Sequence, residues 1–148
     1  MQDFGMQIEA WCEKTEGKLD KVIHSALSEF VQRLIRRTPV GNPAMWKSPP
    51  SRRYVPGMAR AGWHVGTGAP VMRLPLRPDA TGRATAAACI AAIPAKPSGK
   101  LIYISNNVRY IWELERGYSR QTPPNGMVGL SVMEFNSIME QKAMEVIR

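Results

Sequence analysis

Residues 19–38 read LDKVIHSALSEFVQRLIRRT, and they carry the strongest structural signal in the chain. Their apolar positions recur at alternating steps of three and one, which collects them on one face of an α-helix: Leu19, Val22, Ile23, Ala26, Leu27, Phe30, Val31 and Leu34. The helix is expected to end at Thr38, because the residue before a proline avoids the helical region of backbone space. Upstream, Phe4, Ile8 and Trp11 extend the same helix toward the N-terminus, with Gly17 as its weak point.

Residues 38–57 differ in character from the helix that precedes them. They contain Pro39, Pro43, Pro49, Pro50 and Pro56, together with Gly41 and Gly57, and they show no periodicity. A loop of this length without regular structure is uncommon inside a compact domain and is typically functional. Trp46 and Tyr54 within it are costly to leave in water. We therefore interpret residues 38–57 as an extended arm whose aromatic side chains are buried against their own domain or against a neighbour.

The rest of the chain predicts a small sheet and further helices. Strands are expected over residues 58–65, 100–105 and 127–133, and the second of these, KLIYIS, is rich in β-branched and aromatic residues. The alanine-rich stretch 81–93 favours a helix over a strand, with Asp79 or Thr81 as its cap.

Two more helices complete the predicted fold. A short helix capped by Asn106 or Asn107 is expected to end at Gly117, and the last helix to begin near Glu134. The sum is one α+β domain over residues 1–148, with a long N-terminal helix and a C-terminal helix packed on a small, mainly antiparallel sheet.

The charge of the chain is concentrated in its middle. Residues 1–40 hold six basic and six acidic groups, and residues 101–148 hold five of each. Residues 41–100 hold nine basic groups against Asp79 alone, which accounts for the whole formal excess of +8. A basic segment attracts polyanions. Because aromatic residues interleave with its arginines, contact with nucleic acid and a solvated basic loop are both open interpretations.

The sequence offers no recognisable catalytic or metal-binding pattern. His24 and His64 are far apart, and with Cys12 and Cys89 they match no zinc spacing. Gly99-Lys100 lacks the flanking residues of a phosphate-binding loop, and no clustered carboxylates accompany the basic segment. We therefore expect a protein that is not an enzyme and that has no cofactor. We also expect two free thiols, no signal peptide and no membrane span.

Two ordered motifs resemble the neck or tail-completion proteins of long-tailed bacteriophages, the group that includes the minor tail protein Z of lambda-like phages. The first is Thr38-Pro39-Val40, followed by a proline-rich loop, Arg60 and Trp63. The second runs through Asn106, Asn107, Tyr110, Glu115, Gly117, Ser119, Gln121, Pro123, Gly126 and Met127. The chain departs from the family at Gly41-Asn42-Pro43, where Asp-Thr-Gly is common, and at the additional Pro124.

The resemblance implies a structural role in the virion. Such proteins form a ring, here expected to be sixfold, that joins tail to head around the DNA channel and is assembled in the host cytoplasm. The implied neighbours are copies of the chain itself, head-completion or connector proteins, and tail-terminator or tail-tube proteins.

Specific residues follow from this hypothesis. Its subunit-interface candidates are Pro39, Trp46, Pro50, Tyr54, Trp63, Glu115, Ser119, Gln121, Pro123 and Met127. Its candidates for non-specific contact with DNA phosphates in the channel are Arg52, Arg53, Arg73 and Arg77. Glu115 and Gly117 also fit a purely structural role at a helix end. The alternative function is that of a small basic nucleic-acid-binding protein.

Overall fold

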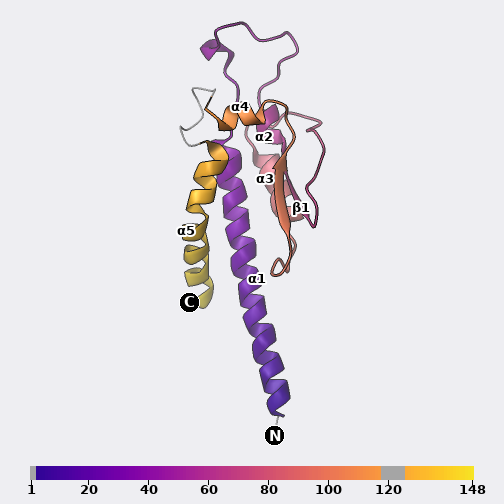
Figure 1. The fold of residues 1–148 in the computed structure, drawn as a ribbon, viewed down its shortest axis with the longest axis vertical. Helices are drawn as coiled ribbons and strands as arrows, with labels where there is room; N and C mark the ends of the chain where they lie inside the picture. Colours follow the sequence, from indigo (N-terminus) through magenta and orange to yellow (C-terminus); the bar gives the residue numbers. More distant parts are fainter. Residues whose placement is uncertain (1–2, 118–125) are drawn as a thin grey trace.

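The computed structural model of the chain describes residues 3–117 and 126–148 (Figure 1). Helices α1 (Phe4–Arg37) and α5 (Met127–Ile147) lie side by side, and the sheet lies on the other flank of α1. The remaining elements are the 3₁₀-helix η1 (Pro43–Met45), α2 (Met58–Ala61), β1 (Trp63–Thr67), α3 (Arg83–Ala92), β2 (Ile102–Asn106) and α4 (Ile111–Glu115). The fold is α+β, as predicted.

Helix α1 is longer than the body that packs against it. The Asp3 carboxylate accepts the Gly5 N–H at its start, and the helix runs through Gly17 without a break. Only the part beyond residue 19 contributes buried residues, whereas every residue from 3 to 19 is exposed. The first turns therefore project from the body, as the ribbon in Figure 1 shows.

The core lies where α1, α3, α5 and the sheet meet. Its buried residues are Phe30, Val31, Leu34, Ile35, Trp63, Val65, Cys89, Ile93 and Met127. Phe30 and Phe135 meet edge to face with ring centroids 5.6 Å apart, which joins α1 to α5. Each fully buried large apolar side chain contributes about 1.5–3 kcal/mol, so the periodic face of α1 anchors the whole domain.

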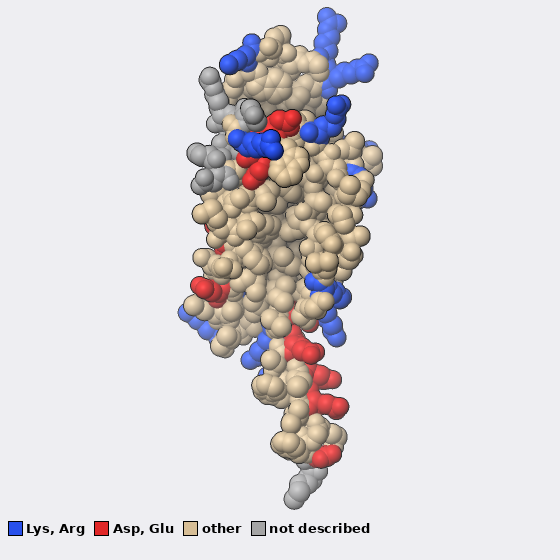
Figure 2. All heavy atoms as spheres, viewed as in Figure 1, with Lys and Arg blue, Asp and Glu red and all other residues tan. Residues whose placement is uncertain are grey.

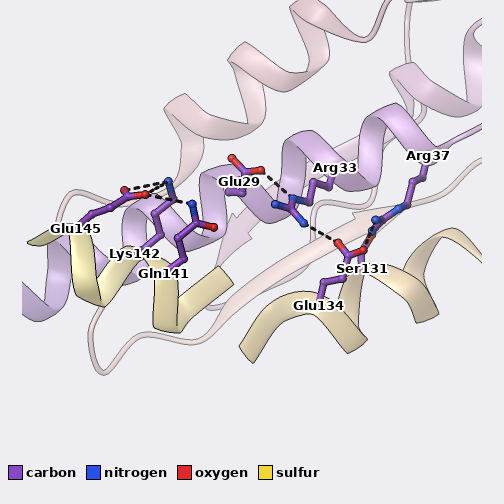
Figure 3. A network of polar contacts seen from close by, with 8 residues as sticks. All are labelled: Glu29, Arg33, Arg37, Ser131, Glu134, Gln141, Lys142 and Glu145. Carbon is purple, nitrogen blue, oxygen red and sulfur yellow. Dashed lines mark hydrogen bonds and ion pairs between the residues drawn. The ribbon is translucent and has the colours of Figure 1, made fainter. Parts of the chain in front are cut away.

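A polar network also joins α1 to α5 (Figure 3). Glu134 of α5 accepts hydrogen bonds from Arg33 at 2.9 Å and from Arg37 at 2.5 Å. Arg33 also pairs with Glu29 at 2.8 Å, and Arg37 donates to the hydroxyl of Ser131 at 3.0 Å. The bonds from Arg37 and then Arg33 lower the pKa of the Glu134 carboxyl. The network fixes the rotation of α5 against α1.

Within residues 3–117 and 126–148, the sheet has two strands. Strands β1 and β2 pair antiparallel, with Trp63 opposite Asn106 and Thr67 opposite Ile102. The predicted strand at 100–105 is thus confirmed as β2, with its bounds shifted slightly. The predicted helix at 81–93 is confirmed as α3. Asp79 caps α3 from outside it, by accepting the N–H groups of Gly82 at 2.9 Å and Thr85 at 2.8 Å.

Two strand predictions need correction. Residues 58–61 form helix α2, and the strand begins only at Trp63. Residues 127–133 are not a strand but the first turns of α5, which therefore begins well before Glu134. Met127, Ser131 and Ile138 are its buried residues, a helical spacing. In runs this short, alternation of apolar residues does not separate a strand from a helix.

One cap prediction is also wrong. Helix α4 has Tyr110 at its N-cap position and no side-chain cap, so neither Asn106 nor Asn107 caps it. Asn106 instead accepts the Val108 N–H at 3.1 Å in the turn that precedes the helix. The expected end at Gly117 does occur, with the glycine at a φ of 83° that disfavours other residues.

Candidate functional site: the arm and its anchor

The arm, residues 38–57, projects from the end of the molecule opposite the N-terminus (Figure 1). Most of its residues are exposed, including its three basic ones, Lys47, Arg52 and Arg53. The arm contains no acidic residue. Figure 2 shows basic side chains standing out at this end of the molecule. The arm therefore presents a positively charged, solvent-facing surface.

Aromatic packing closes the arm on itself. The rings of Trp46 and Tyr54 meet edge to face with centroids 4.6 Å apart. Gly41 lies directly under Tyr54, and a Cβ added there would come within 1.7 Å of the tyrosine oxygen. Partial burial raises the pKa of the Tyr54 hydroxyl. The arm is thus a compact loop with a defined shape, although Trp46 keeps 41% of its surface exposed.

Arg60 of α2 anchors the base of the arm. Its guanidinium donates to the Thr38 carbonyl at 2.9 and 3.0 Å, to the Arg36 carbonyl at 3.1 Å and to the Ala80 carbonyl at 2.6 Å. The bonds to Arg36 and Thr38 satisfy carbonyl groups at the C-terminus of α1, where a positive charge is also favourable. Burial lowers the pKa of Arg60. Arg60 therefore acts as the C-terminal cap of a helix more than twenty residues upstream.

A second anchor runs through Trp63. Its indole N–H donates to the Thr38 hydroxyl at 2.8 Å, and that hydroxyl donates to the Leu34 carbonyl at 2.8 Å. Thr38 is fully buried, and Trp63 is 5% exposed. Of the interface candidates, Trp63 therefore lies in the core of its own chain and offers almost no surface to a neighbour. Pro39 beside it is also buried.

The two motifs that carry the family resemblance contact each other at the base of the arm. The Asn106 amide donates to the Ala59 carbonyl at 2.8 Å, which ties the end of β2 to α2. Gly62 permits this approach, because a Cβ there would lie 2.4 Å from the Asn106 oxygen. Asn107 donates to the Val71 carbonyl at 2.8 Å. The asparagine pair thus braces α2 and the segment that follows β1.

Glu115 caps helix α5 from α4. Its carboxylate accepts the N–H groups of Val128 at 2.8 Å and Gly129 at 3.0 Å, two of the donors that the start of a helix leaves unsatisfied. Gly126 makes room for it, because a Cβ there would lie 2.2 Å from a carboxylate oxygen. The sequence left two roles open for Glu115, one at a subunit interface and one at a helix end, and the structure shows the second. Met127, another interface candidate, is 0% exposed and belongs to the core.

The other predicted residues divide by exposure. Tyr54 and Pro50 are half-buried within the arm, and Trp46 is exposed. The phosphate candidates are all exposed, in the arm and in the segment after β1: Arg52, Arg53, Arg73 and Arg77. The candidates Ser119, Gln121 and Pro123 lie outside the described residues. The sequence analysis did not identify two exposed apolar surfaces as candidate sites. One is the projecting face of α1, and the other is formed by the side chains of residues 70–78.

The part of the chain that the structure describes contains no cluster of side chains suited to bind a metal ion. In residues 3–117 and 126–148, no three side chains among His, Cys, Asp and Glu are placed to hold a metal ion. No helix there is long and apolar enough to cross a membrane. An open depression on α1 is lined by Glu29, Arg33, Arg36 and Arg37. Most of these side chains form ion pairs with one another or with Glu134 of α5.

Comparison with known protein families, curated proteins and solved structures finds no match to this chain.

Proposed function

We propose that the chain is a structural protein of the head–tail connector of a long-tailed phage. In this role it joins tail to head as a ring of identical copies, expected to be sixfold, around the DNA channel. Its neighbours are then connector or head-completion proteins and tail-terminator or tail-tube proteins. It is assembled in the host cytoplasm, becomes part of the virion, and carries out no reaction.

The pre-organised arm is the observation that carries this proposal. Trp46, Tyr54 and Gly41 close the loop before any partner arrives, so little conformational entropy is lost when it binds. Exposed tryptophan and arginine side chains are the residues that most often dominate binding energy at interfaces. A shaped projection of this kind suits docking to a neighbouring subunit.

The residues behind the resemblance support the same proposal. Thr38, Arg60 and Trp63 from one motif interlock at the base of the arm, and Asn106 from the other ties into α2. Their spacing in the sequence therefore corresponds to one anchoring structure, which would be needed wherever a projecting arm must keep its direction.

Localisation tests the proposal directly. We expect peptides of this chain in purified phage particles, and immunogold label at the junction between head and tail. Deletion of residues 43–55 should leave separate filled heads and separate tails, because the arm is lost while its anchor remains. Particles with the control changes Arg83→Glu/Arg148→Glu, at exposed residues outside residues 38–57, should assemble normally. Complete particles that lack the chain would contradict the proposal.

A second candidate function, non-specific nucleic-acid binding, is favoured by the exposed arginines of residues 41–78. If it holds, the purified chain binds duplex DNA near physiological salt with a steep salt dependence. Arg52→Glu/Arg53→Glu should then abolish binding, whereas Arg83→Glu/Arg148→Glu, with the same change in charge, should not. Equal effects of the two pairs would show only a general charge effect.

A further inference from the structure

The projecting part of α1 carries an apolar stripe in solvent. Phe4, Ile8, Trp11 and Leu19 are 73%, 46%, 67% and 47% exposed. Their spacing places them on one face of the helix, continuous with the face that becomes the core further along. A row of exposed apolar side chains of this kind marks a candidate interaction site. The stripe spans about 24 Å at the helical rise per residue.

An acidic row flanks this stripe. Glu9, Glu13 and Glu16 recur at helical spacing on one side of it. Together with Asp3 they outweigh Lys14 and Lys18, which gives residues 3–19 a net charge of −2. In Figure 2, acidic side chains follow the projecting end of the molecule. The surface that covers the stripe should therefore be both apolar and basic.

Residues 70–78 form a surface with this composition. Met72, Leu74 and Leu76 are 76%, 58% and 99% exposed, and they alternate with Arg73 and Arg77. The stretch contains no acidic residue. Its start is held in place, because the Val71 carbonyl accepts hydrogen bonds from Ser105 at 3.0 Å and Asn107 at 2.8 Å.

The two surfaces cannot meet within one chain. Residues 71–73 lie beside the end of β2, which pairs with Trp63, and Trp63 is bonded to Thr38 at the C-terminal end of α1. The stripe lies at the other end of the same continuous helix. The helical rise puts Trp11 about 40 Å from Thr38. A contact between these complementary surfaces must therefore join two copies.

We propose that residues 4–19 of α1 dock, through the apolar stripe, on residues 70–78 of a second copy of this chain, with Glu9, Glu13 and Glu16 facing Arg73 and Arg77. The two sides of this contact differ, so it is heterologous and repeats from copy to copy. The inference deepens the proposed function and rests on its self-association, because it identifies which surfaces would join neighbours in the ring.

Native Cys12 provides a probe, because it is exposed and lies beside the stripe, whereas Cys89 is buried. Unlabelled wild-type protein is mixed with ¹⁵N-labelled Cys12→Ser/Leu76→Cys protein and oxidised mildly. A disulfide dimer of one unlabelled and one labelled chain then shows that Cys12 of one copy lies close to position 76 of the other. We expect severalfold more of it than with Cys12→Ser/Met133→Cys, whose thiol replaces an exposed residue of α5. Equal yields from positions 76 and 133, or no mixed dimer, would overturn the proposal.

Charge reversal adds a test that a folding defect cannot mimic. Glu9→Lys/Glu13→Lys in the Cys12 partner should reduce the mixed dimer severalfold. Adding Arg73→Glu/Arg77→Glu to the Leu76→Cys partner should restore it, and an absence of rescue would count against the contact. If the chain is found in phage particles but the mixed disulfide dimer does not form in solution, only the proposed contact is overturned. If the mixed dimer forms but the chain is absent from particles, only the proposed phage role is overturned.

Discussion

The indole N–H of Trp63 donates to the hydroxyl of Thr38 at 2.8 Å, and this bond ties the start of β1 to the end of α1 across the base of the arm. Both residues are buried. The hydroxyl in turn donates a hydrogen bond to the Leu34 carbonyl, so it satisfies a donor and an acceptor at once. The arm therefore leaves the body from a point that is fixed on two sides, by this bond and by Arg60.

We expect Thr38→Val to destabilise the domain by about 1–3 kcal/mol, because it leaves the buried Trp63 N–H without its acceptor. The free energy of unfolding in urea measures the effect. Thr67→Val, at the exposed end of β1, is the matched control and should change stability little. Equal losses at the two positions would contradict the role assigned to the Thr38 hydroxyl.

Removal of the Glu115 carboxylate should weaken the start of α5. Glu115→Ala leaves the N–H groups of Val128 and Gly129 without their acceptor, and loss of such a cap costs about 0.5–2 kcal/mol. Hydrogen exchange should accelerate at these two amides in particular. Glu113→Ala, in the same short helix but exposed, should leave their exchange unchanged, and acceleration there as well would argue against a specific cap.

The cap also shows where sequence reasoning succeeds and where it stops. Helix α1 was predictable because its periodicity from Leu19 to Leu34 persists over several turns, and Gly17, the expected weak point, does not interrupt the helix. The start of α5 was not, because its N-cap is Gly126 and the capping carboxylate comes from a different helix. Arg60 likewise reaches carbonyl groups that are distant in the sequence. Side chains that act across elements leave no local pattern.

The arm was predictable as a loop, but its internal packing was not. Prolines and glycines mark residues 38–57 as a loop, but the packing of Tyr54 over Gly41 depends on a turn whose path the composition does not specify. Trp63 and Met127 were assigned to an interface from a resemblance, and both lie in the core of the chain. A recurring residue pattern by itself does not distinguish folding from binding.

Acid should destabilise the contact between α1 and α5. The pKa of Glu134 is lowered from 4.5 by its bonds to Arg37 and Arg33. A lowered folded-state pKa gives stability that is present above 4.5 and is lost as the pH falls through the folded-state value. Glu134→Gln should therefore flatten the fall in unfolding free energy below about pH 4.5. Glu140→Gln, exposed on the same helix, should retain the wild-type slope, and identical slopes in all three proteins would contradict the assignment.

The two thiols should differ sharply in reactivity. Burial raises the pKa of Cys89 to about 11, and its sulfur lies 3.3 Å from the Trp63 carbonyl. Because the thiolate is the reactive form, a disulfide reagent at neutral pH should label Cys12 rapidly and Cys89 only on unfolding. Cys12→Ser should remove the fast phase entirely. A fast phase that survives in this variant would show that the core around Cys89 opens readily.

The shape of the arm should depend on the absence of a side chain at position 41. In Gly41→Ala the new Cβ would fall 1.7 Å from the Tyr54 oxygen, so Tyr54 must leave its place against Trp46. We expect little change in the unfolding free energy, because the arm lies outside the core, but faster tryptic cleavage after Lys47, Arg52 and Arg53. Gly17→Ala is the matched control, since nothing lies within 4 Å of its new Cβ, and cleavage of its arm should match wild type. If Gly41→Ala were cleaved at the wild-type rate, the arm would not owe its conformation to this packing, and the case for a pre-organised docking element would fail.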